Sequence, residues 1–214
     1  ASLAAGNAYN AVHKAVQVAL AQIAKDNGLE VKLELTDIFE AKDGEGRGAK
    51  VWWPDLAVDI PQIDKLNSRR WHLGPVRTHF LDVKAIHPNR LAAYTREREP
   101  ELGAETRQKD AITNIKRQFH LAHQQGRKIQ GQDPNLVFDS VLIEAPTVGA
   151  YCEFSPHLNS YLETIADIYA YNHWQILGYK TIPAAANVYA NRIKWQVHAV
   201  AARTKAATLL QLVD

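Results

Sequence analysis

Apolar residues recur along this chain with two periods, and each period predicts one kind of secondary structure. Where they return every three or four residues, as over 8–26, they form the stripe of an amphipathic helix, which Asn27-Gly28 would end. Where they alternate with polar residues or form a short β-branched run, they predict a strand. The elements that follow, in chain order, are a helix over 8–26, strands over Leu29–Leu35, Leu56–Ile60 and Val76–Ile86, a helix over 104–125, a strand over Leu136–Glu144, and helices over 157–177 and 186–212.

This order of elements predicts an α/β fold in a single domain over residues 1–214. The length, with 46% hydrophobic and 22% charged residues, is ordinary for a domain that buries its own core, and it excludes bulk disorder. One cysteine, Cys152, excludes an internal disulfide and favours an intracellular, reducing compartment. No run approaches the roughly 20 apolar residues of a membrane helix, so no membrane partner is expected. Because the chain contains no Met, we expect it to be part of a larger polypeptide.

Net charge alone does not identify a partner. Lys and Arg number 25 against 23 Asp and Glu, a formal net charge of +2, which is too mild to indicate nucleic acid. The basic residues crowd the middle third, however, and the predicted helix over 104–125 carries Gln108, Lys116 and Arg117 on its polar side. These three side chains are candidates for nucleic-acid binding through phosphate contacts, and the alternative is a solvated helix face.

Two short polar motifs at predicted strands carry the candidate chemistry. Pro54-Asp55 precedes one strand, and Asp82-Val83-Lys84 lies within the next strand between apolar residues. Side chains at i and i+2 of a strand share a face, so Asp82 and Lys84 should point together while Val83 points the other way. A hairpin linking the two strands would bring Asp55 beside Asp82. The alternative is an ordinary Asp82–Lys84 pair on a solvent-facing strand edge.

The predicted cluster offers hard oxygen ligands. Asp55, Asp82 and the backbone carbonyl of Val83 would suit Mg²⁺ or Mn²⁺. Such an ion neutralises a scissile phosphate and lowers the pKa of its water, and a neighbouring Lys84 would position or deprotonate that water. Asp55, Asp82 and Lys84 are therefore the predicted catalytic residues of a phosphodiester-cleaving site, and Asp55, Asp82 and Val83 are its predicted metal ligands.

The pattern Pro54-Asp55 followed by Asp82-Val83-Lys84 resembles the signature of the PD-(D/E)XK, or restriction-endonuclease-like, nuclease superfamily. The order of the first predicted elements is similar to the core of that fold, over about 8–150, and residues 157–214 would be a helical C-terminal extension. The resemblance implies a mixed β-sheet core flanked by helices. It also implies a Mg²⁺-dependent endonuclease, a hydrolase whose nucleic-acid substrate is DNA rather than RNA.

Within that superfamily the layout is similar to the restriction-like endonuclease domains of non-LTR retrotransposons. Asn10 matches the last position of the Arg-His-Asn element that starts the first helix in that group. Lys116 with Phe119, and the run Val141–Gly149, resemble two further features of the group. A retroelement origin would imply a nuclear location.

Four residues are candidate accessory groups of this site. Asp59 would share a strand face with Asp55, and Glu34 would substitute for the acidic residue that many superfamily members carry on the first helix. His13 resembles the helix histidine that viral cap-snatching endonucleases of the superfamily use as a metal ligand, and Asn10 completes the set. Since those viral enzymes cut RNA, RNA is an alternative substrate. A catalytically silent nuclease-like fold that docks nucleic acid or protein is the alternative function.

Overall fold

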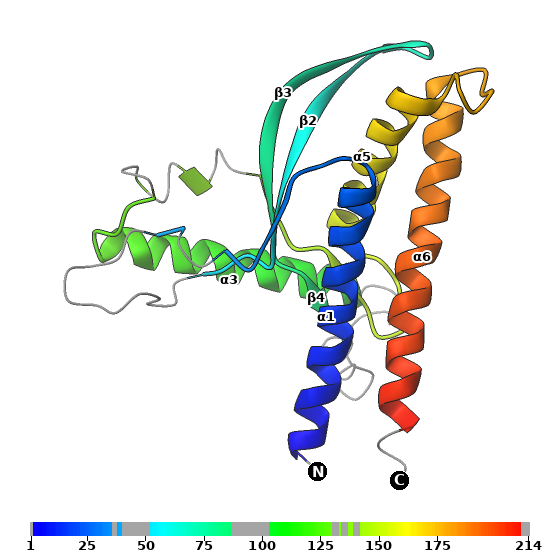
Figure 1. Ribbon diagram of the computed structural model, residues 1–214. Coiled ribbons are helices and arrows are strands. Elements are labelled where there is room, and N and C mark those ends of the chain that lie inside the picture. Colours follow the sequence, from blue (N-terminus) through cyan, green and yellow to red (C-terminus); the bar gives the residue numbers. More distant parts are fainter. Residues whose placement is uncertain are drawn as a thin grey trace.

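The computed structural model describes residues 2–35, 38–39, 52–86, 103–129, 133, 137–138 and 142–210, with side chains from residue 10 onward. It shows a mixed α/β fold, which confirms the predicted class (Figure 1). One sheet has the strand order β1-β2-β3-β5, and a second, smaller sheet pairs β4 with β6. The elements are α1 (Ser2–Asp26), β1 (Val31–Leu33), β2 (Leu56–Asn67), β3 (Arg70–Leu81), β4 (Lys84–Ala85), α3 (Gly103–Gln124), β5 (Leu142–Glu144), β6 (Thr147–Val148), α5 (Pro156–His173) and α6 (Ile182–Leu210).

Helix α1 ends where the sequence predicts but begins earlier. Its last residue is Asp26, and Gly28 then adopts a φ of +74°, a conformation that glycine takes at little cost after a helix. Val12, Val16 and Leu20 form its buried face, as the apolar stripe predicts. The helix begins at Ser2 instead of residue 8, and the start of the chain is rich in alanine, the residue with the highest helix propensity.

Strand β1 is shorter than predicted. It covers only Val31–Leu33, because Glu34 adopts a φ of +50° and so leaves the extended conformation. Leu33 is 47% exposed, so the predicted alternation of buried and exposed residues is weak in this edge strand.

Strands β2 and β3 form an antiparallel hairpin that is much longer than the two predicted strands. The ladder pairs Leu56 with Leu81 at its base and Asn67 with Arg70 at its turn. Sequence reasoning ended the first strand before Pro61, but the ladder passes this proline at a register shift, where a missing N–H is tolerated. In Figure 1 the hairpin curves from the centre of the molecule to the loop between α5 and α6.

Two other predicted strands differ from the structure. The strand predicted over Val76–Ile86 is interrupted at Asp82-Val83, where β3 ends and β4 follows. In the strand predicted over Leu136–Glu144, Val137 and Phe138 are helical and only β5 is extended, while the other positions lie outside the described residues. A short apolar run does not distinguish a strand from a helical turn by its periodicity, which explains this error.

Two apolar clusters cover the base of the hairpin. In the larger one, Leu81 and Val83 pack with residues of α1, α5 and α6. In the smaller one, Phe80 packs with Trp52 and with Phe119 of α3. Because neighbouring strand residues point to opposite faces, α1, α5 and α6 cover one face of the hairpin base and α3 covers the other. The polar segment at the end of β3 therefore lies where both helical layers meet.

Candidate functional site

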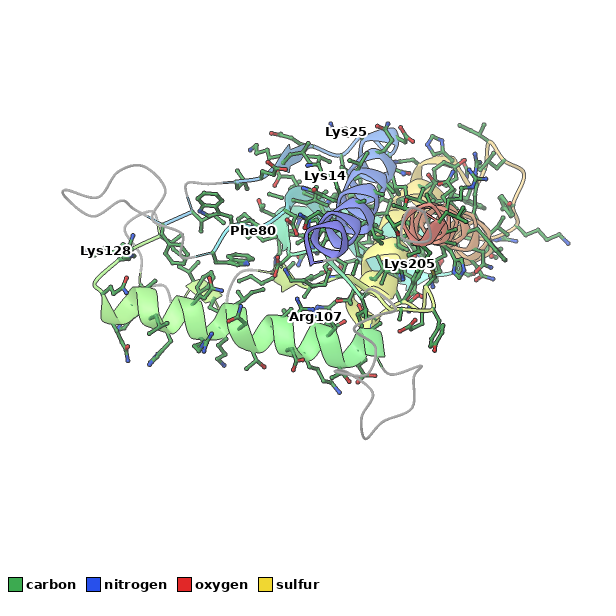
Figure 2. The ribbon with its side chains drawn as sticks, turned by 90° about the horizontal axis from the view of Figure 1, so that it is seen from below. Lys14, Lys25, Phe80, Arg107, Lys128 and Lys205 are labelled. Atoms are coloured by element: carbon green, nitrogen blue, oxygen red, sulfur yellow. The ribbon has the colours of Figure 1, made fainter. Side chains whose placement is uncertain are left out.

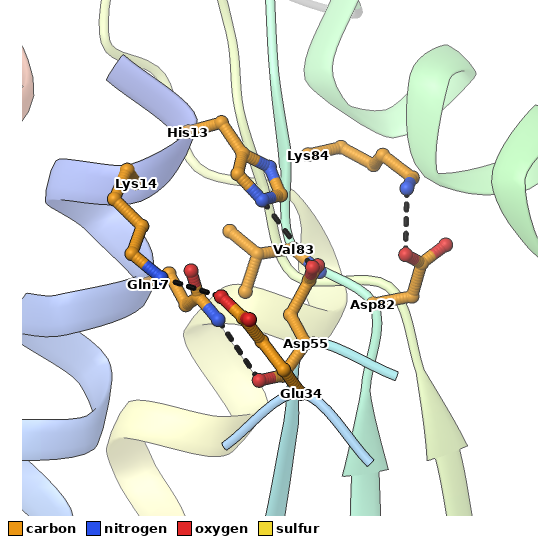
Figure 3. Close-up of polar contacts among 8 residues, drawn as sticks. All are labelled: His13, Lys14, Gln17, Glu34, Asp55, Asp82, Val83 and Lys84. Atoms are coloured by element: carbon orange, nitrogen blue, oxygen red, sulfur yellow. Dashed lines mark hydrogen bonds and ion pairs between the residues drawn. The ribbon is translucent and has the colours of Figure 1, made fainter. Parts of the chain in front are cut away.

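Asp55 lies at the base of the hairpin, one residue before β2. Its backbone N–H donates to the carbonyl oxygen of Leu81 at 2.9 Å, which fixes Asp55 beside the end of β3. Its carboxylate Oδ2 accepts a hydrogen bond from the backbone N–H of Val83 at 2.7 Å, and its Oδ1 lies 3.3 Å from Nε2 of His13. The hairpin thus brings Asp55 next to the Asp-Val-Lys segment, as the sequence predicts (Figure 3).

Asp82 and Lys84 point to the same side of the chain. Nζ of Lys84 donates to Oδ1 of Asp82 at 2.6 Å, and Val83 between them is fully buried in the larger core cluster. The backbone N–H groups of Asp82 and Lys84 donate to the carbonyl oxygens of Glu144 and Pro146, both at 2.9 Å, and hold this segment against its neighbour. The predicted alternation is therefore kept even though the strand is interrupted here.

Burial dominates the electrostatics of Asp82. The residue is only 8% exposed, and burial raises the pKa of its carboxyl above the ordinary value of 3.8. The Lys84 ammonium opposes this rise through its charge and its hydrogen bond, whereas the Asp55 carboxylate adds to it. The charges of Lys84 and Asp55 therefore act on the Asp82 carboxyl in opposite directions, and burial outweighs both.

Helix α1 supplies two side chains to this site. His13 contacts Asp55, and Gln17, one turn further along the helix, donates from Nε2 to the backbone carbonyl oxygen of Asp55 at 2.9 Å. The backbone N–H of Glu34 donates to the same oxygen at 3.0 Å. Sequence reasoning missed Gln17, which is 1% exposed. The available signal was its i, i+4 spacing from His13, which places both side chains on one helix face.

The other accessory candidates make different contacts. The carboxylate of Asp59 accepts a hydrogen bond from Oγ1 of Thr78, its partner across the ladder, at 2.5 Å. The carboxylate of Glu34 forms an exposed ion pair with a lysine of α1 at 2.6 Å, and Asn10 is exposed on the same helix. Of the four accessory candidates, His13 is therefore the one whose side chain contacts a predicted catalytic residue.

The position of Gln108 corrects its prediction as a phosphate contact. Its side chain is buried, with the residue 7% exposed, and its Oε1 accepts a hydrogen bond from the backbone N–H of His157 at 2.8 Å. The first turn of a helix has backbone N–H groups without intrahelical acceptors, and Gln108 satisfies one of them in α5. A polar residue on the exposed side of a predicted helix is thus used to join two helices.

Lys116 and Arg117 do reach the surface of α3. Both are exposed; Nζ of Lys116 lies 5.8 Å from the ring centre of Phe138, and Arg117 donates to the side chain of Asn114. Figure 2 shows α3 projecting away from α1, and Lys128, just beyond its end, lies at the far tip of this projection. The two predicted basic contacts therefore lie on an arm that extends outward from the hairpin base.

The hairpin base carries carboxylate oxygens, the type of ligand that hard divalent cations prefer. Asp55 and Asp82 offer carboxylate oxygens on either side of the Val83 backbone (Figure 3). Within the described parts of the chain, no three His, Cys, Asp or Glu side chains converge as a ready-made ligand set. Mg²⁺ does not require one, since it keeps several waters and binds proteins through one or two carboxylates.

Comparisons with protein-family models, with curated proteins and with solved structures found no match for this chain. Among the residues that the structure describes, no helix is both long and apolar enough to cross a bilayer.

Proposed function

We propose that this chain is a metal-dependent endonuclease of the PD-(D/E)XK type that cleaves phosphodiester bonds in DNA. The observation that carries the proposal is that the Asp55 carboxylate accepts a hydrogen bond from the backbone N–H of Val83, the residue between Asp82 and Lys84, at the base of one hairpin. The resemblance of their sequence pattern to that superfamily supports the proposal, and so does the mixed α/β fold around them.

Each of these residues has a role that its surroundings support. Asp55 and Asp82, with the Val83 carbonyl, would hold Mg²⁺ or Mn²⁺. When bound, such an ion supplies positive charge to the scissile phosphate and lowers the pKa of a water molecule. Lys84 would orient the attacking water from a backbone position fixed by its hydrogen bond to Pro146. The hydrogen bond from the Val83 N–H would orient the Asp55 carboxylate, and the one from Gln17 to the Asp55 backbone carbonyl would hold the residue in place.

The direct test is cleavage of plasmid DNA by the parent chain and by Asp82→Asn, in Mg²⁺, in Mn²⁺ and with a chelator. We expect Asp82→Asn to lower the cleavage rate at least about 100-fold, because it removes one of the two charged ligands. Asp64→Asn is the matched control, since Asp64 is an exposed carboxylate of the same hairpin, and it should cut as the parent does. Equal rates for Asp82→Asn and the parent would show that the site is wrongly assigned.

A catalytically silent docking module is the second candidate, favoured by the lack of a three-ligand cluster in the described residues. Calorimetry with Mn²⁺ separates the two functions, because a catalytic site binds the ion and loses that binding in Asp55→Ala. A docking module shows neither effect. The contact of His13 with Asp55 also favours testing RNA in the cleavage assay, since the cap-snatching enzymes that this site resembles use a helix histidine.

A further inference from the structure

The far end of the hairpin is a rigid surface built from two segments, which we call the basic hairpin end: the turn 67–70 and the loop 174–181. The backbone N–H of Ile182 donates to the carbonyl oxygen of Ser68 at 2.9 Å, and Nε of Arg69 donates to the carbonyl oxygen of Lys180 at 3.2 Å. Trp71, 5% exposed, packs against α5 and α6 just below. The turn is therefore fixed to the helical layer.

Within the turn 67–70 and the loop 174–181 every Asp, Glu, Lys or Arg position is a cation, and the nearest carboxylate on the hairpin is the exposed Asp64, which pairs with His72 in the ladder. Arg69, Arg70 and Lys180 are exposed, and residues 66–73 and 171–182 contain no Asp or Glu. Further down the hairpin, Asp167 is already paired with Lys65 at 2.6 Å. Although the whole chain has a formal net charge of only +2, the basic hairpin end alone contributes three formal positive charges. Such a concentration of cations fits a polyanionic partner.

Exposed apolar side chains lie beside these cations. Leu66 is 60% exposed, Ile176 is 83% exposed and Leu177 is 48% exposed. Proteins that bind the minor groove of a duplex combine arginine with leucine or isoleucine wedges of this kind. A guanidinium group also binds a phosphate through two parallel hydrogen bonds, which a lysine does not. The composition therefore fits a nucleic-acid duplex.

The hairpin sets the distance between this surface and the candidate catalytic site. β3 spans 12 residues from Arg70 to Leu81, directly before Asp82, which corresponds to about 40 Å along the strand and to a shorter straight-line distance, because the hairpin curves (Figure 1). One turn of B-form duplex is about 34–36 Å long. Figure 1 shows the hairpin running from its base, beside α1 and β4, to the α5–α6 loop at the other end.

We propose that the basic hairpin end binds the duplex backbone about one helical turn away from the bond held at Asp55 and Asp82. This inference rests on the proposed function for its choice of nucleic acid as the partner. Binding there fixes the register of the duplex at the site and contributes affinity without taking part in the chemistry.

The test is fluorescence anisotropy of a labelled 30-base-pair duplex with the full chain, over a series of salt concentrations, in Ca²⁺ or chelator so that binding is measured without cleavage. The variant combines Arg69→Gln, Arg70→Gln and Lys180→Gln. Its matched control combines Lys25→Gln, Arg192→Gln and Arg203→Gln, which removes the same charge from exposed positions of α1 and α6. Thermal melting of both variants checks that they remain folded.

The slope of log Kobs against log salt is negative, and we expect its magnitude to fall by about two to three for the hairpin-end variant, since each lost phosphate contact lowers the magnitude by about one. The control should change it by less than one. Equal slopes for the two variants would overturn the proposal. So would unchanged duplex binding together with a loss of binding to phosphatidylserine vesicles, which would assign the surface to anionic lipid.

The same variants separate this inference from the proposed function. If the parent cuts DNA but the hairpin-end variant binds duplex like its control, the proposed nuclease stands and this inference fails. If neither the parent nor the variants cut DNA in any metal, but the slope of log Kobs against log salt is still shallower in the hairpin-end variant than in its control, the duplex surface stands and the proposed catalytic site fails.

Discussion

Lys84→Met tests whether the Asp82 carboxyl is held in a charged site rather than on an ordinary surface. Nζ of Lys84 lies 2.6 Å from Asp82, and the two side chains are only 20% and 11% exposed. Removing one partner of a buried ion pair costs about 3–5 kcal/mol, because the remaining charge stays desolvated. Since both groups here keep some exposure, we expect a loss of about 3 kcal/mol at pH 7. For a chain of this size that lowers Tm by about 6–12 °C.

The size of this loss should depend on pH. Burial already raises the pKa of Asp82 above 3.8, and Lys84→Met removes the cation that opposes the rise. Between 3.8 and the raised pKa, the folded state binds more protons than the unfolded state, so stability falls as pH rises through this window. In Lys84→Met the pKa of Asp82 should rise further, so the pH range over which stability falls becomes wider. The variant should therefore be closer to the parent at pH 4, where a larger fraction of Asp82 carries a proton and needs no cation, than at pH 7.

Urea unfolding at pH 4 and pH 7 measures both effects. Lys194→Met is the matched control, because Lys194 pairs with Glu163 at a similar distance, but the carboxylate side chain is 58% exposed. That surface pair should be worth less than about 1 kcal/mol at either pH. A loss in Lys84→Met below about 1 kcal/mol at pH 7, or an equal loss at both pH values, would refute the reasoning.

Three further substitutions test individual contacts. Gln17→Met removes the hydrogen bond to the backbone of Asp55, so we expect the free energy of unfolding in urea to fall by about 1 kcal/mol. The rate of DNA cleavage should fall by more than the tenfold to which about 1.4 kcal/mol corresponds, because the Asp55 carboxylate shifts. Gln108→Ala leaves the first turn of α5 without its acceptor, so it should lower stability by about 1–2 kcal/mol while duplex affinity by anisotropy stays unchanged. Burial lowers the pKa of Lys205 from its ordinary value of 10.5, so the unfolded state binds more protons than the folded state just below pH 10.5. The free energy of unfolding of the parent should therefore rise with pH in this range, and urea unfolding of Lys205→Met should show no such rise.

The features of the fold that follow from local signals were predicted from the sequence. The end of α1 at Asp26 follows from a glycine that accepts a positive φ, and its buried face follows from apolar spacing. The hairpin base follows from two apolar segments with a polar stretch between them. Its length does not, because Pro61 and the charged residues near the turn argue locally against a strand. The ladder continues there because Trp71 and Ile63 pack against the helices, a long-range contact that no local pattern contains.

The candidate site was predicted where its residues share one strand or one hairpin, and was missed where two distant elements meet. Asp82 and Lys84 are two residues apart, so strand geometry alone aligns them. Gln17 reaches Asp55 across 38 positions of sequence, and Gln108 reaches His157 across 49. Both are buried glutamines on helices whose polar side was expected to face solvent. The sequence shows that such a residue is polar, but only the packing of α1 on the hairpin, or of α3 on α5, shows which backbone group it satisfies.

Asp82 is a buried charged residue whose position is not explained by a hydrogen bond to a neutral backbone group. Its neighbours Leu81 and Val83 are fully buried, and the burial that raises the pKa of its carboxyl means that a charged side chain at this point weakens the fold. The buried polar side chains of Gln17, Gln108 and Thr147 are compensated by hydrogen bonds to neutral backbone groups. Asp82 is instead balanced by one ammonium and opposed by a second carboxylate, Asp55. A cation shared by the two carboxylates would remove that repulsion, and this is a second reason, beside the sequence pattern, to propose a ligand at the hairpin base.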